Sequence, residues 1–138
     1  MSSFDLNQIK NALADVAWLD IMDPRPDHEG EKTGIRIKLA APDSPAYRDL
    51  ESAIIDRGLA KAAKRRNGAA PITSVSLEKE KIEFLVGITI DWEGVVFDGQ
   101  EMPFTPENAK ILYSEPRLRF LNNQVDAFAS DRRNFFVN

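Results

Sequence analysis

The chain has 138 residues, of which 43 % are hydrophobic and 29 % are charged, as expected for one globular domain spanning 1–138. Its 18 basic and 22 acidic residues give a net charge of −4, which supplies no overall attraction to nucleic acid or to a membrane surface. There is no cysteine, which excludes disulfides and thiolate chemistry, and no run reaches the roughly 18 apolar residues of a membrane helix.

The first third of the chain predicts a short helix and then a β-hairpin. Apolar residues recur at loosely helical spacing over 3–16, where the basic region and apolar run of a signal peptide are both missing. Residues 16–22 alternate in part, and residues 34–39 alternate strictly between apolar and other side chains, as on a half-buried strand. The turn-rich residues 23–30 separate the two stretches, so we expect a hairpin with a long loop.

Two helix starts follow the same chemical rule. Ser44-Pro45 and Thr105-Pro106 each place a capping hydroxyl before a proline, whose missing amide would be unpaired in the first turn anyway. The first of these helices is expected to continue through the basic residues 61–66 and to end at Asn67-Gly68.

A final helix is predicted near the C-terminus, with Ser114 as its cap and Pro116 in its first turn. It carries the cleanest amphipathic stripe of the chain, formed by Leu118, Leu121, Val125 and Phe128. Before it, Asp98-Gly99 predicts a tight turn.

The segment Ser74–Trp92 fits two structures. Residues 82–92 alternate like a strand, whereas Leu77, Phe84, Leu85, Ile88 and Trp92 fit one face of a helix. Periodicity alone leans slightly towards a strand.

Motifs that carry catalysis or bind a cofactor are not apparent. His28 is the only histidine and is expected to be solvated in its loop, and the acidic residues around it do not follow the EF-hand spacing. The glycines form neither a phosphate-binding loop nor a dinucleotide fingerprint, and the pair Asp91 and Glu93 is of a kind that arises by composition alone. We therefore predict no enzyme, no cofactor and no metal site.

Three features are candidate partner-binding sites: a basic run, an internal aromatic pair and a C-terminal aromatic pair. The basic run Lys61–Arg66 fits a helix C-terminus better than a phosphate-binding patch, because no aromatic residues interleave with it. Trp92 and Phe104 fit a core better than a surface. The terminal pair Phe135-Phe136 either folds back onto the body or awaits a partner, and the sequence leaves both open.

The order of several short motifs resembles the tail assembly chaperones of long-tailed phages and prophages. The motifs are Pro42-Asp43-Ser44-Pro45-Ala46-Tyr47-Arg48, Asp91-Trp92-Glu93-Gly94, Phe97-Asp98-Gly99, Pro103-Phe104-Thr105-Pro106-Glu107-Asn108-Ala109 and Asn134-Phe135. The resemblance covers about Leu39 to Phe136, although the spacing around Phe97-Asp98-Gly99 is inexact. It implies a non-enzymatic protein of the host bacterial cytoplasm that binds the tape-measure protein and assists assembly of the tail-tube protein around it. It also favours a helix over residues 74–91.

The expected fold is α+β, with an N-terminal β-hairpin packed with a mainly helical C-terminal part. On chemical grounds, the candidate partner-binding residues are four aromatic anchors and three steering charges: Trp92, Phe104, Phe135, Phe136, Lys64, Arg65 and Arg66. The alternatives are a structural head-tail connector or tail-completion protein and, behind it, an RNA-binding regulatory module. The oligomeric state stays open.

Overall fold

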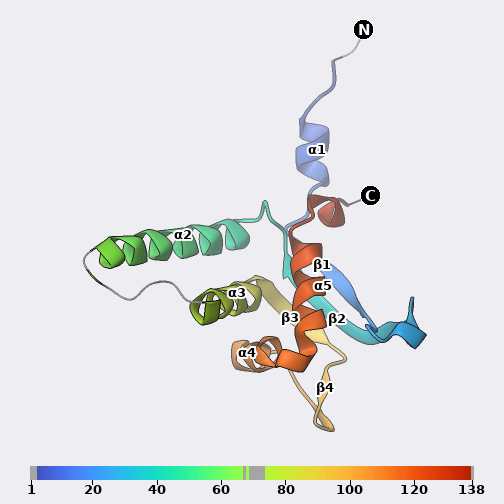
Figure 1. Ribbon diagram of the computed structural model, residues 1–138. Helices are drawn as coiled ribbons and strands as arrows, with labels where there is room; N and C mark the ends of the chain where they lie inside the picture. The colour runs from blue at the N-terminus through green and yellow to red at the C-terminus, as the bar shows by residue number, and fades with distance from the viewer. Residues whose placement is uncertain (1–2, 67, 69–73, 138) are drawn as a thin grey trace.

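The computed structural model describes residues 3–66, 68 and 74–137, and it is built around a three-stranded antiparallel sheet (Figure 1). The strands are β1 (Val16–Met22), β2 (Lys32–Ala40) and β3 (Thr89–Glu93), in the order β1-β2-β3. The predicted hairpin is therefore confirmed, with a 3₁₀ turn (Pro26–His28) in its long loop. The third strand lies at the end of the segment Ser74–Trp92, for which the sequence left a strand and a helix open.

The ambiguous segment contains both structures. Helix α3 (Ser74–Ile88) is followed directly by strand β3, so the helical prediction holds up to Ile88 and the strand pattern holds after it. Leu85 and Ile88 are fully buried on one side of the helix, and Trp92 is buried on the strand.

The two predicted hydroxyl caps are confirmed. Helix α2 (Pro45–Arg66) begins where Tyr47 N donates to Ser44 Oγ at 3.3 Å, and helix α4 (Pro106–Ser114) begins where Asn108 N donates to Thr105 Oγ1 at 3.0 Å. Although α2 is 22 residues long, no helix in the described parts of the chain combines the length and apolar character needed to cross a bilayer.

Both ends of the chain differ from the prediction in detail. Helix α1 is shorter than expected (Asn7–Ala12) and buries no residue. The final helix α5 (Arg119–Ala129) is preceded by a separate 3₁₀ turn (Pro116–Leu118), whose cap is Glu115. Ser114 ends α4 instead of capping the next helix. Pro116 disfavours a helical backbone at the residue before it, Glu115, so α4 stops at Ser114 and Glu115 takes the capping position. A last 3₁₀ turn follows at Arg132–Phe135.

The Asp98-Gly99 turn is also confirmed. It joins the two-residue strands β4 (Val96–Phe97) and β5 (Gln100–Glu101), and both turn residues have positive φ, 54° and 77°, as a tight hairpin requires.

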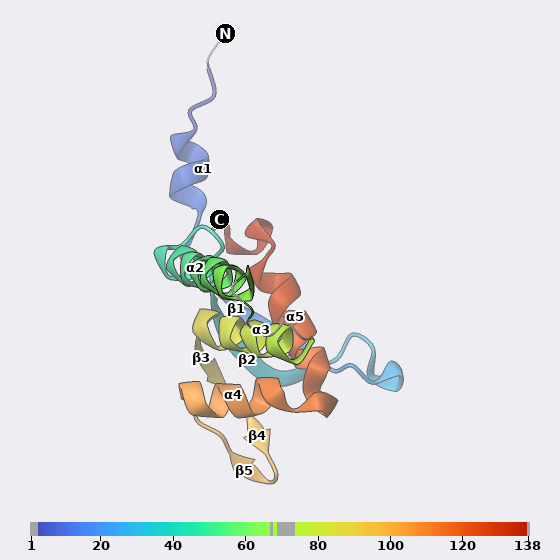
Figure 2. The same ribbon diagram turned by 60° about the vertical axis from the view of Figure 1, so that its left-hand side comes forward.

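Helices α3, α4 and α5 lie together on one side of the sheet, whereas α1 extends away from the body and α2 stands off to the side (Figures 1 and 2). The core joins this side of the sheet to the three helices and includes Ile21, Ile37, Leu39, Leu85, Ile88, Trp92, Leu112, Tyr113, Leu121 and Val125. The fold is α+β, with the N-terminal hairpin packed against a mainly helical C-terminal part.

Candidate functional site

Over the first half of α2, buried and half-buried side chains pack closely on α3. Tyr47 is buried there and packs edge-to-face on Phe84, with ring centroids 5.0 Å apart. Leu50 comes so close to Gly87 that a Cβ atom on the glycine would lie 2.5 Å from it. The missing side chain of Gly87 therefore allows this half of α2 to pack on α3.

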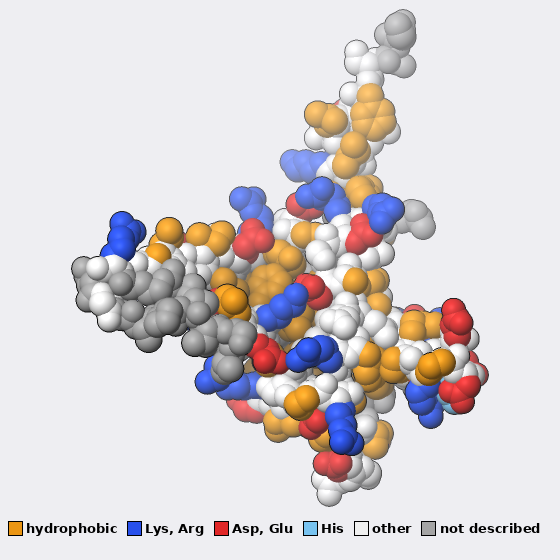
Figure 3. Space-filling model, viewed as in Figure 1, with side chains coloured by type: hydrophobic (Ala, Val, Ile, Leu, Met, Phe, Trp, Pro, Cys, Tyr) orange, Lys and Arg blue, Asp and Glu red, His pale blue; other side chains and the backbone are white. Residues whose placement is uncertain are grey.

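Further along α2 an apolar groove of about 300 Å³ opens between the two helices. Its apolar lining comes from Ile54 and Ile55 on α2 and from Leu77 and Phe84 on α3. Ile55 is 56 % exposed and Leu77 is 55 % exposed, and Leu59, one helical turn beyond Ile55, is 66 % exposed. Figure 3 shows hydrophobic side chains gathered where α2 faces the body.

Charged residues border this groove. Lys61 Nζ donates to Glu80 Oε1 at 2.5 Å across the two helices and holds the pKa of Glu80 below its usual range, and Lys81 pairs with Asp126 of α5 at 2.9 Å. Glu51 also lines the groove but takes part in no ion pair among the described residues. These ion pairs are exposed and contribute little to stability, so the interactions among the described residues hold the outer half of α2 only weakly.

A larger hollow, about 660 Å³, lies on the other side of α3, against α4. Its lining mixes both signs of charge, including Lys79, Glu83, Glu107 and Lys110, with the half-buried Ile82 and Val86. None of the large apolar side chains that are strongly exposed in the described structure lines it. The α2–α3 groove is therefore the better candidate for binding an apolar partner.

Trp92 and Phe104 lie in the interior, as their core interpretation predicts. Their rings pack edge-to-face at 5.1 Å, and Trp92 Nε1 donates to Met102 O at 2.7 Å. Trp92 is 6 % exposed. These two side chains join β3 to the segment after the β4–β5 hairpin and are not available as surface anchors.

The two C-terminal phenylalanines differ from each other. Phe135 is buried and packs on Phe128 at 5.5 Å, whereas Phe136 is 41 % exposed. The backbone of this segment pairs with residues 12–14, with an isolated bridge between Leu13 and Phe136. The fold-back alternative therefore holds for Phe135.

The steering charges lie near the end of α2. Lys64 and Arg66 are exposed, and the side chain of Arg65 lies outside the described part of the structure. Since Trp92 and Phe135 are buried and Phe104 is half-buried against Trp92, only Phe136 of the four aromatic anchors is exposed, and the seven predicted residues do not form one exposed surface.

The groove residues were not predicted as a site. Ile54 belongs to the apolar stripe that Tyr47 and Leu50 begin, but Ile55 and Leu59 lie off that stripe, four residues apart. An apolar pair at i and i+4 beside the core-facing stripe of a charged helix was the signal that could have identified the groove.

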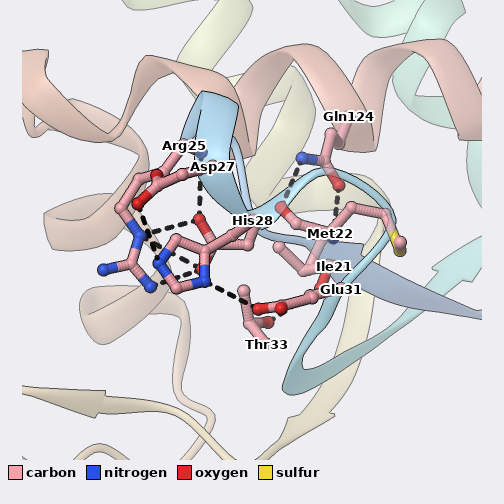
Figure 4. Close-up of polar contacts among 9 residues, drawn as sticks. Ile21, Met22, Arg25, Asp27, His28, Glu31, Thr33 and Gln124 are labelled. Carbon is pink, nitrogen blue, oxygen red and sulfur yellow. Dashed lines mark hydrogen bonds and ion pairs between the residues drawn. The ribbon is translucent and has the colours of Figure 1, made fainter.

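The loop around His28 is the only group of potential metal ligands found among the described residues (Figure 4). Ligand atoms of Asp23, His28 and Glu31 lie within 4.8 Å of one another. However, Arg25 donates to both carboxylate oxygens of Asp23 and holds the pKa of that carboxyl well below its usual range, and His28 Nδ1 lies 2.7 Å from Glu31 Oε2. The loop uses these groups to hold itself together.

Two pairs of polar side chains remain, one exposed and one in the core. Asp91 and Glu93 are exposed on β3, and the fully buried hydroxyl pair Thr89 and Tyr113 lies in the core without a carboxylate or histidine partner. No family model matches the chain, and neither the curated proteins nor the solved structures include a significant match to it.

Proposed function

We propose that the protein is a non-enzymatic assembly chaperone that holds an apolar helical segment of a longer partner protein in the α2–α3 groove. The observation that carries the proposal is a pair of exposed aliphatic side chains, Ile55 and Leu77, that line a groove on an otherwise charged body, with the exposed Leu59 one helical turn beyond Ile55. From the sequence resemblance to phage tail assembly chaperones, the partner that we propose is a tape-measure protein, which is long and helical.

A helix is the occupant that suits this groove. Helix α2 is about 33 Å long, and a second helix laid along it could present apolar residues at i, i+3, i+4 and i+7 to the exposed aliphatic side chains. The exposed ion pairs Lys61–Glu80 and Arg57–Glu83 hold the outer half of α2 only weakly, so α2 can adjust to helices of different size.

Charge narrows the class of partner helix further. Of the acidic residues that line the groove, Glu80 pairs with Lys61 and Asp126 pairs with Lys81. Glu51 takes part in no ion pair among the described residues, so the groove favours a helix with Lys or Arg beside its apolar stripe. A holdase of this kind would keep such a segment soluble until its final partners assemble around it.

The test is co-expression with the long, helix-rich protein encoded beside this chain, comparing wild type with Ile55→Asp and Ile111→Asp. Ile111 is a matched control, because it is 51 % exposed against 56 % for Ile55 and lies on α4, outside the groove. We expect the partner to be soluble and to co-purify with the wild type and with Ile111→Asp, and to precipitate with Ile55→Asp.

Two outcomes would reject the proposal: a partner that stays insoluble beside the wild-type protein, or an equal effect of the two substitutions. Detection of the chain in purified virions would instead favour the structural alternative, a head-tail connector or tail-completion protein.

A further inference from the structure

The backbone of β1 has one edge that faces away from β2. Ala41 N donates to Asp15 O at 2.8 Å, so Asp15 points towards β2, and the direction alternates from residue to residue along an antiparallel pair. The N–H and C=O groups of Val16, Trp18 and Asp20 therefore point outwards. Because the sheet order is β1-β2-β3, this side of β1 is the border of the sheet (Figure 1).

Just before β1, the chain's own C-terminal segment occupies this edge. Ala14 N donates to Phe135 O at 2.7 Å and Val137 N donates to Ala12 O at 2.6 Å, in antiparallel pairing. The segment thus forms an isolated antiparallel bridge just before β1, but it turns away at Phe135, and its pairing stops at Ala14.

At the other end of β1, a side chain takes the place of a strand. Met22 N donates to Gln124 Oε1 at 2.8 Å, and Gln124 Nε2 donates to Met22 O at 2.9 Å, so the carboxamide satisfies both outward groups of Met22 (Figure 4). Gln124 comes from α5, which fixes where the open edge ends.

Between these ends the edge is open. In the hydrogen bonding of the described residues, no group pairs with the outward N–H or C=O of Val16, Trp18 or Asp20. All three residues are half-buried and none is fully covered. An unpaired edge of this kind accepts an added strand unless charge, proline or a covering element prevents it.

We propose that the Val16–Asp20 edge is a second docking site, which binds an extended peptide segment of a partner protein as an added β-strand. The C-terminal segment already pairs with the backbone just before this edge, and the added peptide would continue the same antiparallel pairing beyond Ala14. The groups that occupy Ala14 and Met22 limit the paired length to about five residues, Val16 to Asp20. This site is separate from the α2–α3 groove and does not depend on it.

Trp18 sets the chemistry of that segment. Its ring lies on the sheet face opposite the core and is covered by Arg36, whose Cζ is 4.9 Å from the ring centroid, and by Lys38 Nζ at 5.9 Å. In an added strand, the residue opposite Trp18 would lie on the same face, beside the indole. An apolar or aromatic side chain is favoured at that position.

The probe is a displayed library of random heptapeptides, selected on the purified full chain, with the selected peptides then synthesised and titrated against variants. Val16→Pro removes an outward N–H that no group of the described structure uses, and places a ring on the docking edge. Val96→Pro is the matched control: Met102 N donates to Val95 O, so the N–H of Val96 points outwards on the β4–β5 hairpin in the same way.

We expect at least about tenfold weaker binding to Val16→Pro and a change within about twofold for Val96→Pro, because the first variant loses a ladder hydrogen bond and meets a steric block. Methylating the backbone nitrogens of a selected peptide one at a time provides a readout that does not depend on either variant folding. Strand addition predicts loss of binding at every second position.

Failure to select any peptide would overturn the proposal. So would peptides whose binding is equally insensitive to both prolines, or a methylation profile without period two. Peptides whose binding is lost in Ile55→Asp would be assigned to the α2–α3 groove, so that a failure of the edge and a failure of the proposed function are distinguishable.

Discussion

The hydroxyl of Tyr113 is buried in the core, 2.7 Å from Thr89 Oγ1. Because Thr89 uses its single proton to donate to Leu85 O at 2.7 Å, Tyr113 is the donor to Thr89. Burial raises the pKa of Tyr113 to about 12. The pKa of Tyr113 is therefore higher in the folded protein than in the unfolded chain, where it is about 10. The stability that this proton contributes is complete below about pH 10 and is lost as the pH rises towards 12.

We therefore expect the free energy of unfolding to fall by about 1.4 kcal/mol per pH unit between about pH 10 and 12 because of this group. Tyr113→Phe should remove most of that dependence and cost about 1 kcal/mol at pH 7 through its lost hydrogen bond. Urea unfolding at several pH values measures both. The pKa of Tyr47 is also raised by burial, which leaves a weaker fall in the variant, and two curves that fall in parallel would contradict the prediction.

Two glycines with nearly the same backbone conformation differ in their surroundings. Gly94 and Gly99 have φ of 76° and 77°, but a Cβ on Gly94 would lie close to the backbone oxygen of Gly34, whereas nothing lies within 4 Å of a Cβ on Gly99. Alanine at either site meets the cost of positive φ, about 1 kcal/mol. Only Gly94→Ala also forces two backbone segments apart.

We expect Gly99→Ala to cost about 1 kcal/mol and Gly94→Ala at least about 2 kcal/mol, measured by chemical unfolding. Equal losses in the two variants would mean that the first part of β2, which contains Gly34, moves freely and does not fix the position of Gly94 at the end of β3.

At the level of elements, Gln124 joins α5 to the end of β1 across 102 residues of sequence. Gln124→Ala would leave the outward N–H and C=O of Met22 without a partner in a half-buried place, which should cost about 1–3 kcal/mol. The neighbouring Asn123 is exposed and serves as the control, since Asn123→Ala should change stability by less than about 0.5 kcal/mol. Thermal unfolding of the two variants compares them directly.

The sequence predicted elements best where local chemistry decides the structure. Ser44 and Thr105 cap their helices because the capping hydroxyl and the following proline act within one turn. The boundary between α3 and β3 was not predictable in this way, because Phe84 and Ile88 satisfy a strand pattern as well as a helical one. Pairing with β2 turns the chain into a strand after Ile88, and this is a contact between distant residues.

At the level of the whole molecule, the sequence predicted the fold class better than the surface. Aromatic residues were considered as anchors because their chemistry suits interfaces, but Trp92 and Phe135 are buried by tertiary packing that no local pattern reveals. The aliphatic pair Ile55 and Leu59 can be seen in the sequence, but its exposure is established only by the structure, in which α2 leaves the body. Whether Ile55 faces solvent or the core depends on where α3 lies.

The N-terminal arm should contribute little to the stability of the rest. Helix α1 buries no residue, and Phe4 and Leu6 are 65 % and 73 % exposed. Removal of residues 1–10 retains the hydrogen bond in which Val137 N donates to Ala12 O. This truncation should therefore shift the midpoint of thermal unfolding by less than about 2 °C. A larger fall would mean that the arm packs on the body in solution.

Helix α2 should not be uniformly stable along its length. Tyr47 and Leu50 pack on α3, whereas from Ile55 onwards most of the described side chains are exposed and only surface ion pairs such as Lys61–Glu80 reach α3. Because local opening is easiest where little apolar surface is buried, amide hydrogen exchange should be at least about tenfold faster in residues 56–64 than in residues 47–54.

Hydrogen exchange followed by mass spectrometry or NMR resolves the two halves of α2. If the occupant proposed for the α2–α3 groove binds there, it should slow exchange in residues 56–64 and leave residues 119–129 of α5 nearly unchanged. Uniformly slow exchange along α2 without a partner would mean that the groove is already closed by contacts within the chain, and the exposed aliphatic side chains would then have no free surface to offer.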